Sequence, residues 1–118
     1  MNEELAMLAE MVDRLFAEQV TRDIRVAAEG GDLPADLWAL VGESGLADPF
    51  ADTDFTWTQA GAIARAVGAH AVPLPLVETL LAGWLLHRAG LAVPEGPLTV
   101  AETLPLPQGA PGPRPQAW

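Results

Sequence analysis

The chain has 118 residues and a formal net charge of −10, with no cysteine, lysine or tyrosine and Ser44 as its only serine. This length suits one domain, and the missing residue types exclude disulfides, thiolate metal sites, Schiff-base lysines and tyrosine acids. Residues 1–54 carry 13 of the 16 acids, a charge that repels phosphate. We therefore expect no nucleic-acid partner and no anionic membrane surface as a partner.

The chain carries no signal for export or for membrane insertion. Its opening, Met1-Asn2-Glu3-Glu4, is acidic where a signal peptide is basic. The longest uncharged run in the apolar part, residues 66–77, is shorter than the roughly 18 to 20 residues that a membrane span requires. We expect a cytoplasmic protein with no membrane partner.

Apolar residues recur at spacings of three and four from Leu5 to Ala27, which predicts one long helix of about 26 residues. Asn2 is placed to cap its start, and Gly30-Gly31 to end it. A short second helix follows from Pro34 and ends at Gly45 in a left-handed conformation. Residues 46–55 are predicted to form a loop.

Two apolar helices are expected within residues 60–91, where the only charges are Arg65, Glu78 and Arg88. Residues 56–59, Thr-Trp-Thr-Gln, match a capping box, so the third helix begins near Trp57 and ends near Ala69. The fourth runs from about Leu76 to Ala89, after two prolines that no single helix absorbs. Because it is apolar on more than one face, we expect it to be central and packed against several neighbours.

The composition changes after Gly90. Residues 94–97 predict a turn, and residues 98–101 a single β-strand without a partner in the chain. Prolines and glycines dominate residues 104–118, which are expected to be extended. The sequence therefore predicts an all-α domain of about four helices over residues 1–93, the truncated start of a β-domain over 94–103, and a tail over 104–118.

Few side chains suggest chemistry. His70 and His87 have no carboxylate at metal-pair spacing and are expected to be structural, at the ends of the third and fourth helices. Ser44 lacks the strand-turn-helix setting of a nucleophile and is better explained as a helix end. Glu78 either stabilises the start of its helix, or faces a ligand cavity or an arginine of another domain. From the residue pattern, we predict no catalytic, cofactor-binding or metal site in this chain.

Three segments resemble the N-terminal helical domain of the acyl-CoA dehydrogenase family. They are residues 33–38 (Leu-Pro-Ala-Asp-Leu-Trp), residues 43–46 (Glu-Ser-Gly-Leu) and the helix pair of residues 62–91. Residues 98–103 resemble the opening of that family's middle β-domain. The family's usual Pro-Glu-x-x-Gly-Gly loop is missing, and the shorter, acidic residues 47–55 stand there, as in divergent subunits of heteromeric members.

The resemblance implies a part of an FAD-dependent enzyme that desaturates acyl-CoA thioesters. In that family the catalytic base and most flavin contacts lie in segments that this sequence does not include, so it implies no FAD binding or turnover by this chain alone. The family's helical domain helps to wall the acyl pocket, and Val72, Leu74 and Leu76 lie about where that wall would be.

Two hypotheses follow. In the first, the chain contributes a pocket wall and subunit packing to an FAD-dependent acyl-CoA dehydrogenase-like oxidoreductase. In the second, it is a free-standing helical protein–protein interaction module without catalytic activity. Both predict a homo- or hetero-oligomer formed through the apolar face of residues 60–91.

Overall fold

The computed structural model describes residues 2–101, and this part of the chain is all-helical. Five α-helices and one 3₁₀ turn follow each other: α1 (Glu3–Gln19), α2 (Arg22–Glu29), α3 (Ala35–Glu43), η1 (Pro49–Ala51), α4 (Trp57–Ala69) and α5 (Leu76–Arg88). The predicted all-α class is confirmed, with one helix more than expected.

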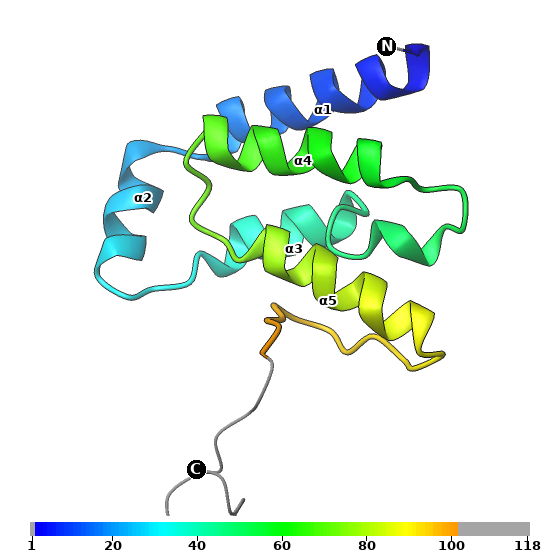
Figure 1. Ribbon diagram of the computed structural model, residues 1–118. Helices are drawn as coiled ribbons and strands as arrows, with labels where there is room; N and C mark the ends of the chain where they lie inside the picture. The colour runs from blue at the N-terminus through cyan, green and yellow to red at the C-terminus, as the bar shows by residue number, and fades with distance from the viewer. Residues whose placement is uncertain (1, 102–118) are drawn as a thin grey trace, which may run out of the picture.

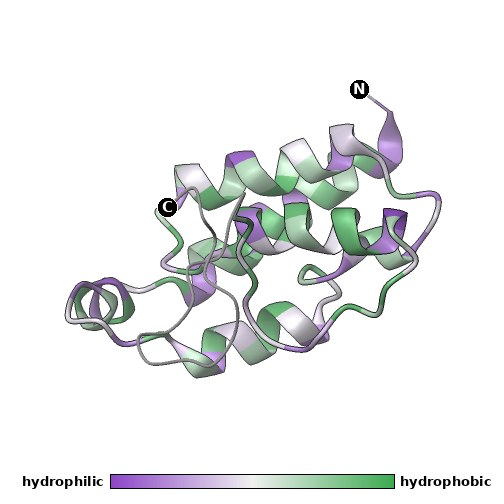
Figure 2. Cartoon of the chain, turned by 60° about the horizontal axis from the view of Figure 1, so that its bottom comes forward, coloured by the Kyte–Doolittle hydropathy of each residue, from purple (hydrophilic) through white to green (hydrophobic). Residues whose placement is uncertain are grey.

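The helices form a small bundle in which α1 lies along α4, and α4 lies along α5 (Figure 1). Hydrophobic positions recur along the helices (Figure 2). Buried residues of α1, α4 and α5 belong to one core cluster. The largest fully buried side chains are Val12, Phe16, Val41, Ile63 and Leu76. The core therefore takes one or two large side chains from each of α1, α3, α4 and α5.

The prediction of one long first helix was wrong, because the chain breaks at Val20. Val20 has an extended backbone and turns its side chain into the core, where it is 7 % exposed. Thr21 then caps a new helix, its hydroxyl accepting a hydrogen bond from the Ile24 amide at 3.2 Å. α2 lies at one end of the bundle, where Ile24 packs against the core but no residue of the helix is fully buried (Figure 1).

The predicted helix ends are confirmed at several places. Asn2 caps α1, and Thr56 and Gln59 form the reciprocal capping box at the start of α4. Gly45 has a φ of 78°, the left-handed conformation expected after α3. These local signals succeeded because each depends only on residues within one turn of the chain.

α4 ends in a left-handed turn at an unusual residue. Ala71 has a φ of 47°, and the amide of Val72 reaches back to the Val67 carbonyl at 3.0 Å. This pattern is a Schellman ending, for which glycine is the usual residue. The prolines at positions 73 and 75 then separate α4 from α5, as predicted.

The fourth helix, expected to be packed against several neighbours, contacts η1 and α4 and is covered on one side only by residues 2–101. One side of α5 is packed in the core through Leu76, Thr79, Leu80, Ala82 and Gly83. Its other side lies at the surface of residues 2–101, because no described helix covers it. When a helix is apolar on two sides, both sides can be buried. The sequence does not show whether the same chain provides the elements that cover each side.

The strand predicted at residues 98–101 is not formed. This segment has no regular secondary structure, and its Leu98 backbone is hydrogen-bonded to a side chain of α5. The Thr79 hydroxyl, 2 % exposed, donates to the Pro75 carbonyl at 2.6 Å and accepts from the Leu98 amide at 3.0 Å. The tail predicted for residues 104–118 lies outside the described residues.

We predict that Ala71→Gly raises the free energy of unfolding by about 0.5–1 kcal/mol. Glycine removes the strain of the left-handed backbone, and this gain exceeds the cost of the greater conformational entropy of glycine in the unfolded chain. Urea unfolding followed by circular dichroism measures this change. Gly45→Ala is the matched control, since it places the same strain at a second left-handed position and should destabilise. A destabilised Ala71→Gly variant would contradict the assigned backbone conformation.

We predict that Thr79→Val lowers the free energy of unfolding by about 1–2 kcal/mol, because it removes the acceptor of the Leu98 amide while keeping the side-chain shape. Proteolysis should then cut residues 92–101 faster. Thr79→Ser retains the hydroxyl and should resemble the original chain in both measurements. Equal proteolysis of the Val and Ser variants would show that this hydroxyl does not hold the segment.

Candidate functional site

The most prominent surface feature is an apolar ridge on the uncovered side of α5. Val77, Leu81 and Leu85 repeat every four residues and are 40, 39 and 42 % exposed. Glu78 and Arg88 are exposed on the same side, near the two ends of the helix. At 3.6 residues per turn, all five lie within roughly 100° of the helix circumference. We call these five residues the α5 face.

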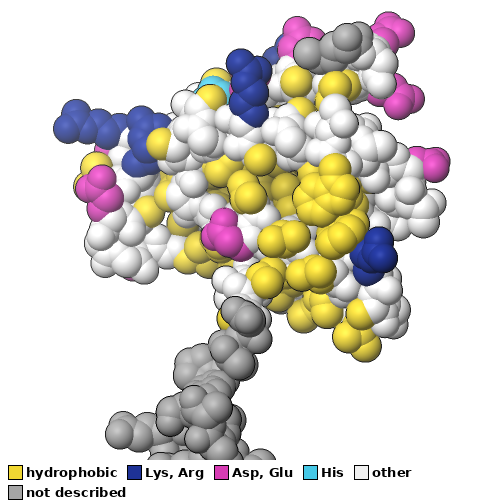
Figure 3. Space-filling model, viewed as in Figure 1, with side chains coloured by type: hydrophobic (Ala, Val, Ile, Leu, Met, Phe, Trp, Pro, Cys, Tyr) yellow, Lys and Arg dark blue, Asp and Glu magenta, His cyan; other side chains and the backbone are white. Residues whose placement is uncertain are grey.

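Hydrophobic side chains gather over α5 and over the space between α4 and α5 in the space-filling view (Figure 3). Scattered exposed apolar residues are ordinary on a protein surface. A contiguous group of them, with charges at its edge, is instead typical of a surface that another molecule covers.

A cluster of four aromatic residues flanks the α5 face. Phe50 contacts Phe55 edge-on at a centroid distance of 5.0 Å and lies 4.8 Å from Trp57. Trp57, which is 48 % exposed, in turn meets Trp84 of α5 at 5.1 Å. The Arg88 guanidinium lies 5.2 Å from the Trp84 ring centroid, a cation–π distance. The cluster thus joins η1, α4 and α5 into one surface.

A histidine–aspartate pair fastens the loop around η1 to α5. His87 Nε2 lies 2.9 Å from Asp48 Oδ1, and both side chains are about one-third exposed. Gly83 allows this approach, because a Cβ there would lie 3.3 Å from the same aspartate oxygen. The pair therefore holds the aromatic cluster in place beside the α5 face.

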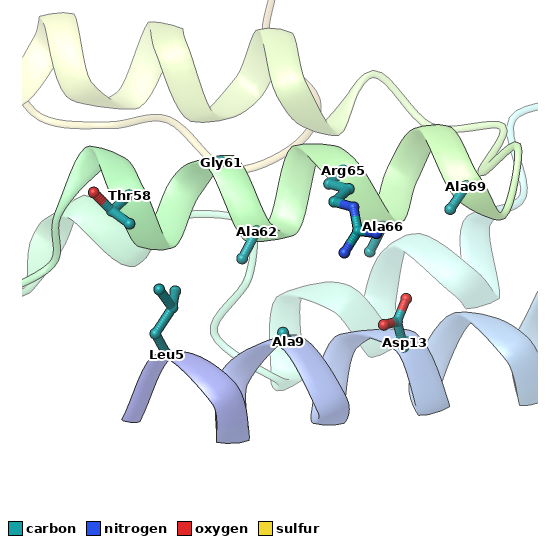
Figure 4. Close-up of a pocket in the computed structure, with 9 residues that line it drawn as sticks. All are labelled: Leu5, Ala9, Asp13, Thr58, Gly61, Ala62, Arg65, Ala66 and Ala69. Atoms are coloured by element: carbon teal, nitrogen blue, oxygen red, sulfur yellow. The ribbon is translucent and has the colours of Figure 1, made fainter. Parts of the chain in front are cut away.

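A groove of about 290 Å³ lies between α1 and α4. Its lining is mostly small or apolar, with Ala9, Gly61 and Ala62 among its residues (Figure 4). Arg65 and Asp13 are its charged residues. Among the described residues, the Asp13 carboxylate has one hydrogen-bond partner, His70 Nε2, at 3.1 Å. The groove offers shape but little chemistry, because its lining contains no nucleophile beside a base.

The three residues expected at an acyl-pocket wall are all in the core. Val72, Leu74 and Leu76 are 8, 7 and 0 % exposed. They join the connection between α4 and α5 to the core cluster, and none of them lines the groove of Figure 4. Any contact between these side chains and a substrate stays a prediction.

The remaining polar residues have structural surroundings. Ser44 closes α3, its hydroxyl donating to the Leu40 carbonyl at 2.9 Å, as expected for a helix end. His70 and His87 lie at the ends of α4 and α5, as predicted. Within residues 2–101, neither histidine has a hydroxyl group hydrogen-bonded to it, so neither forms a nucleophile–base pair.

Sequence reasoning missed the aromatic cluster and both histidine–aspartate pairs. Asp13 and His70 are 57 residues apart, and Asp48 and His87 are 39 apart, so no local spacing connects them. The signal present in the sequence was the density of aromatics in residues 50–57. Because the composition of residues 46–55 predicts a loop, it does not indicate that these aromatic residues pack together.

We predict that Gly61→Ala raises the free energy of unfolding by about 0.5–1 kcal/mol, because alanine favours helix and the added Cβ meets no atom within 4 Å. Thermal unfolding measures the change, and Gly68→Ala, equally open on the same helix, is the matched control. A loss of stability at position 61 alone would mean that α1 and α4 approach more closely than the groove implies.

The described residues contain no group of three or more histidine, aspartate or glutamate side chains that would bind a metal. Over the same range, no helix combines the length and hydropathy needed to cross a membrane. Comparisons with protein-family models, with curated proteins and with solved structures find no match to this chain.

Proposed function

We propose that this chain is a helical docking domain that binds a protein partner through the α5 face and has no catalytic activity of its own. The observation that carries this proposal is the ridge of Val77, Leu81 and Leu85, left uncovered on a helix whose opposite side is fully packed. The domain is proposed to act in the cytoplasm, where a chain without cysteine forgoes no disulfide stabilisation.

Covering the ridge residues with a partner is favourable in free energy. Burying a leucine or valine completely stabilises by roughly 1.5–3 kcal/mol. Each ridge residue retains about 40 % exposure, so covering it contributes on the order of 1 kcal/mol. Trp57 adds a large half-exposed ring beside the ridge, the residue type most often found at the centre of interfaces.

The position of the face also suits docking. A binding surface works best when its side chains are held in place before the partner arrives. Here α5 is anchored by the core on one side and by the Asp48–His87 pair at its end. The ridge residues therefore lose little freedom on binding.

Site-specific photo-crosslinking in cells tests the docking proposal. A photo-reactive residue at position 81 should give one cross-linked product of defined mass, and that product should disappear when Val77 and Leu85 are both replaced by Asp. Val26 is the matched control, because it is an exposed apolar residue on α2, away from the α5 face. Absence of a product at position 81, or an equal product at position 26, would refute the proposal.

A second candidate is the acyl-CoA dehydrogenase-like role, in which the partner is the remainder of an FAD-dependent enzyme. The observation that favours it is the segment of residues 92–101, which continues the chain beyond α5 and is held against that helix by the bond from the Leu98 amide to Thr79. In this role Val72, Leu74 and Leu76 would support a pocket wall from within the core, and acyl-CoA would be the substrate of the complete assembly.

Flavin content distinguishes this candidate from a simple docking domain. The chain is purified together with its cross-linking partner, and the flavin absorbance is recorded before and after addition of acyl-CoA. Bleaching of bound FAD by acyl-CoA supports the enzyme role. An assembly without flavin refutes that role and leaves docking intact.

A further inference from the structure

We infer that the α5 face binds the same face of a second copy of this chain, with the two α5 helices antiparallel about a two-fold axis level with Gly83. This inference rests on the proposed docking function and names its partner. Four observations carry it: the placement of the two charges, the placement of Leu81 and Leu85, the charge distribution of the chain and the size of the face.

The charges of the α5 face complement each other only in the antiparallel arrangement. Glu78 and Arg88 are its only charged residues and are ten positions apart, about 15 Å along the helix. Antiparallel pairing places Glu78 of each copy beside Arg88 of the other copy, so the two-fold symmetry gives two such ion pairs. Parallel pairing would set like charges together, which is unfavourable. Within residues 2–101 neither side chain belongs to an ion pair, and the Arg88 guanidinium lies against the Trp84 ring, 5.2 Å from its centroid.

Two of the three ridge residues, Leu81 and Leu85, have the same centre of symmetry, while Val77 lies outside this pair. The midpoint between Glu78 and Arg88 is position 83, and the midpoint between Leu81 and Leu85 is also position 83. One axis therefore brings Leu81 against the partner's Leu85 while both ion pairs form. Residues spaced four apart form the ridge that most often packs between helices, at a crossing angle of about −50°. At that angle the helices stay close over the central two turns.

The distribution of charge permits two acidic chains to meet here. The chain carries a net charge of −10, but 13 of its 16 acids lie in residues 1–54. On α4 and α5 the formal charges are Arg65, Glu78 and Arg88, so these two helices are not acidic overall. Contact through α5 therefore keeps most of the like charge at a distance, where salt screens it.

The size of the face implies a weak dimer. α5 has 13 residues and is about 20 Å long, and a stable interface buries about 800 Å² per partner. The ridge occupies one side of a single short helix, so we expect a weak dimer with a dissociation constant on the order of 10 μM. Association should be reversible and should depend on concentration.

Sedimentation equilibrium with charge reversal tests the arrangement. The original chain should change from monomer to dimer over about 1–300 μM. Glu78→Arg and Arg88→Glu should each weaken the dimer at least about fivefold, because each places like charges together, and the double variant should recover to within about twofold of the original. Circular dichroism confirms that all three variants fold. Leu81→Asp should abolish the dimer, whereas Val26→Asp on α2 should leave it unchanged.

The outcomes separate this inference from the docking function. A chain that stays monomeric at 300 μM but cross-links from position 81 to a different protein overturns the second-copy inference and leaves docking intact. A dimer that the double variant does not restore overturns the antiparallel arrangement. A dimer that Val26→Asp abolishes and Leu81→Asp leaves intact would place the contact away from α5 and overturn the second-copy inference.

Discussion

The shared core of α1, α4 and α5 is the constraint on which the rest of the structure depends. Phe16, Ile63 and Leu76 each come from one of these helices, and all three are fully buried. Because a bundle this small has one core, each helix can bury only one side in it. For α5, whose sequence is apolar on two sides, this leaves the α5 face without cover.

The surroundings of α5 turn that uncovered side into an ordered surface. The Asp48–His87 pair holds η1 against the end of the helix, and the Thr79 hydroxyl holds Leu98 against its start. Between them, Trp57 and Trp84 pack edge-on and extend the apolar area from α5 toward α4. The proposed docking function rests on this combination of exposure and rigidity.

Helix starts and ends could be predicted because their signals are local. The capping box at Thr56 and Gln59, the cap at Asn2 and the left-handed Gly45 all depend on neighbours within four residues. The break at Val20 shows where such reasoning fails. The apolar spacing continues through it, but the core draws the Val20 side chain inward, and Thr21 is able to begin a new helix. Spacing alone cannot reveal that competition.

The sequence by itself determined the helical class, most helix boundaries and the excess of apolar side chains in residues 60–91. Only the tertiary structure decided which side of α5 is buried, where Val72, Leu74 and Leu76 lie, and which aspartates meet the two histidines. The physical reason is that hydrophobic burial has no direction: a pattern shows that a side chain prefers to leave water, and only the packed neighbours determine which contact removes it. The apolar residues of the α5 face are side chains that the packing of residues 2–101 leaves exposed to water.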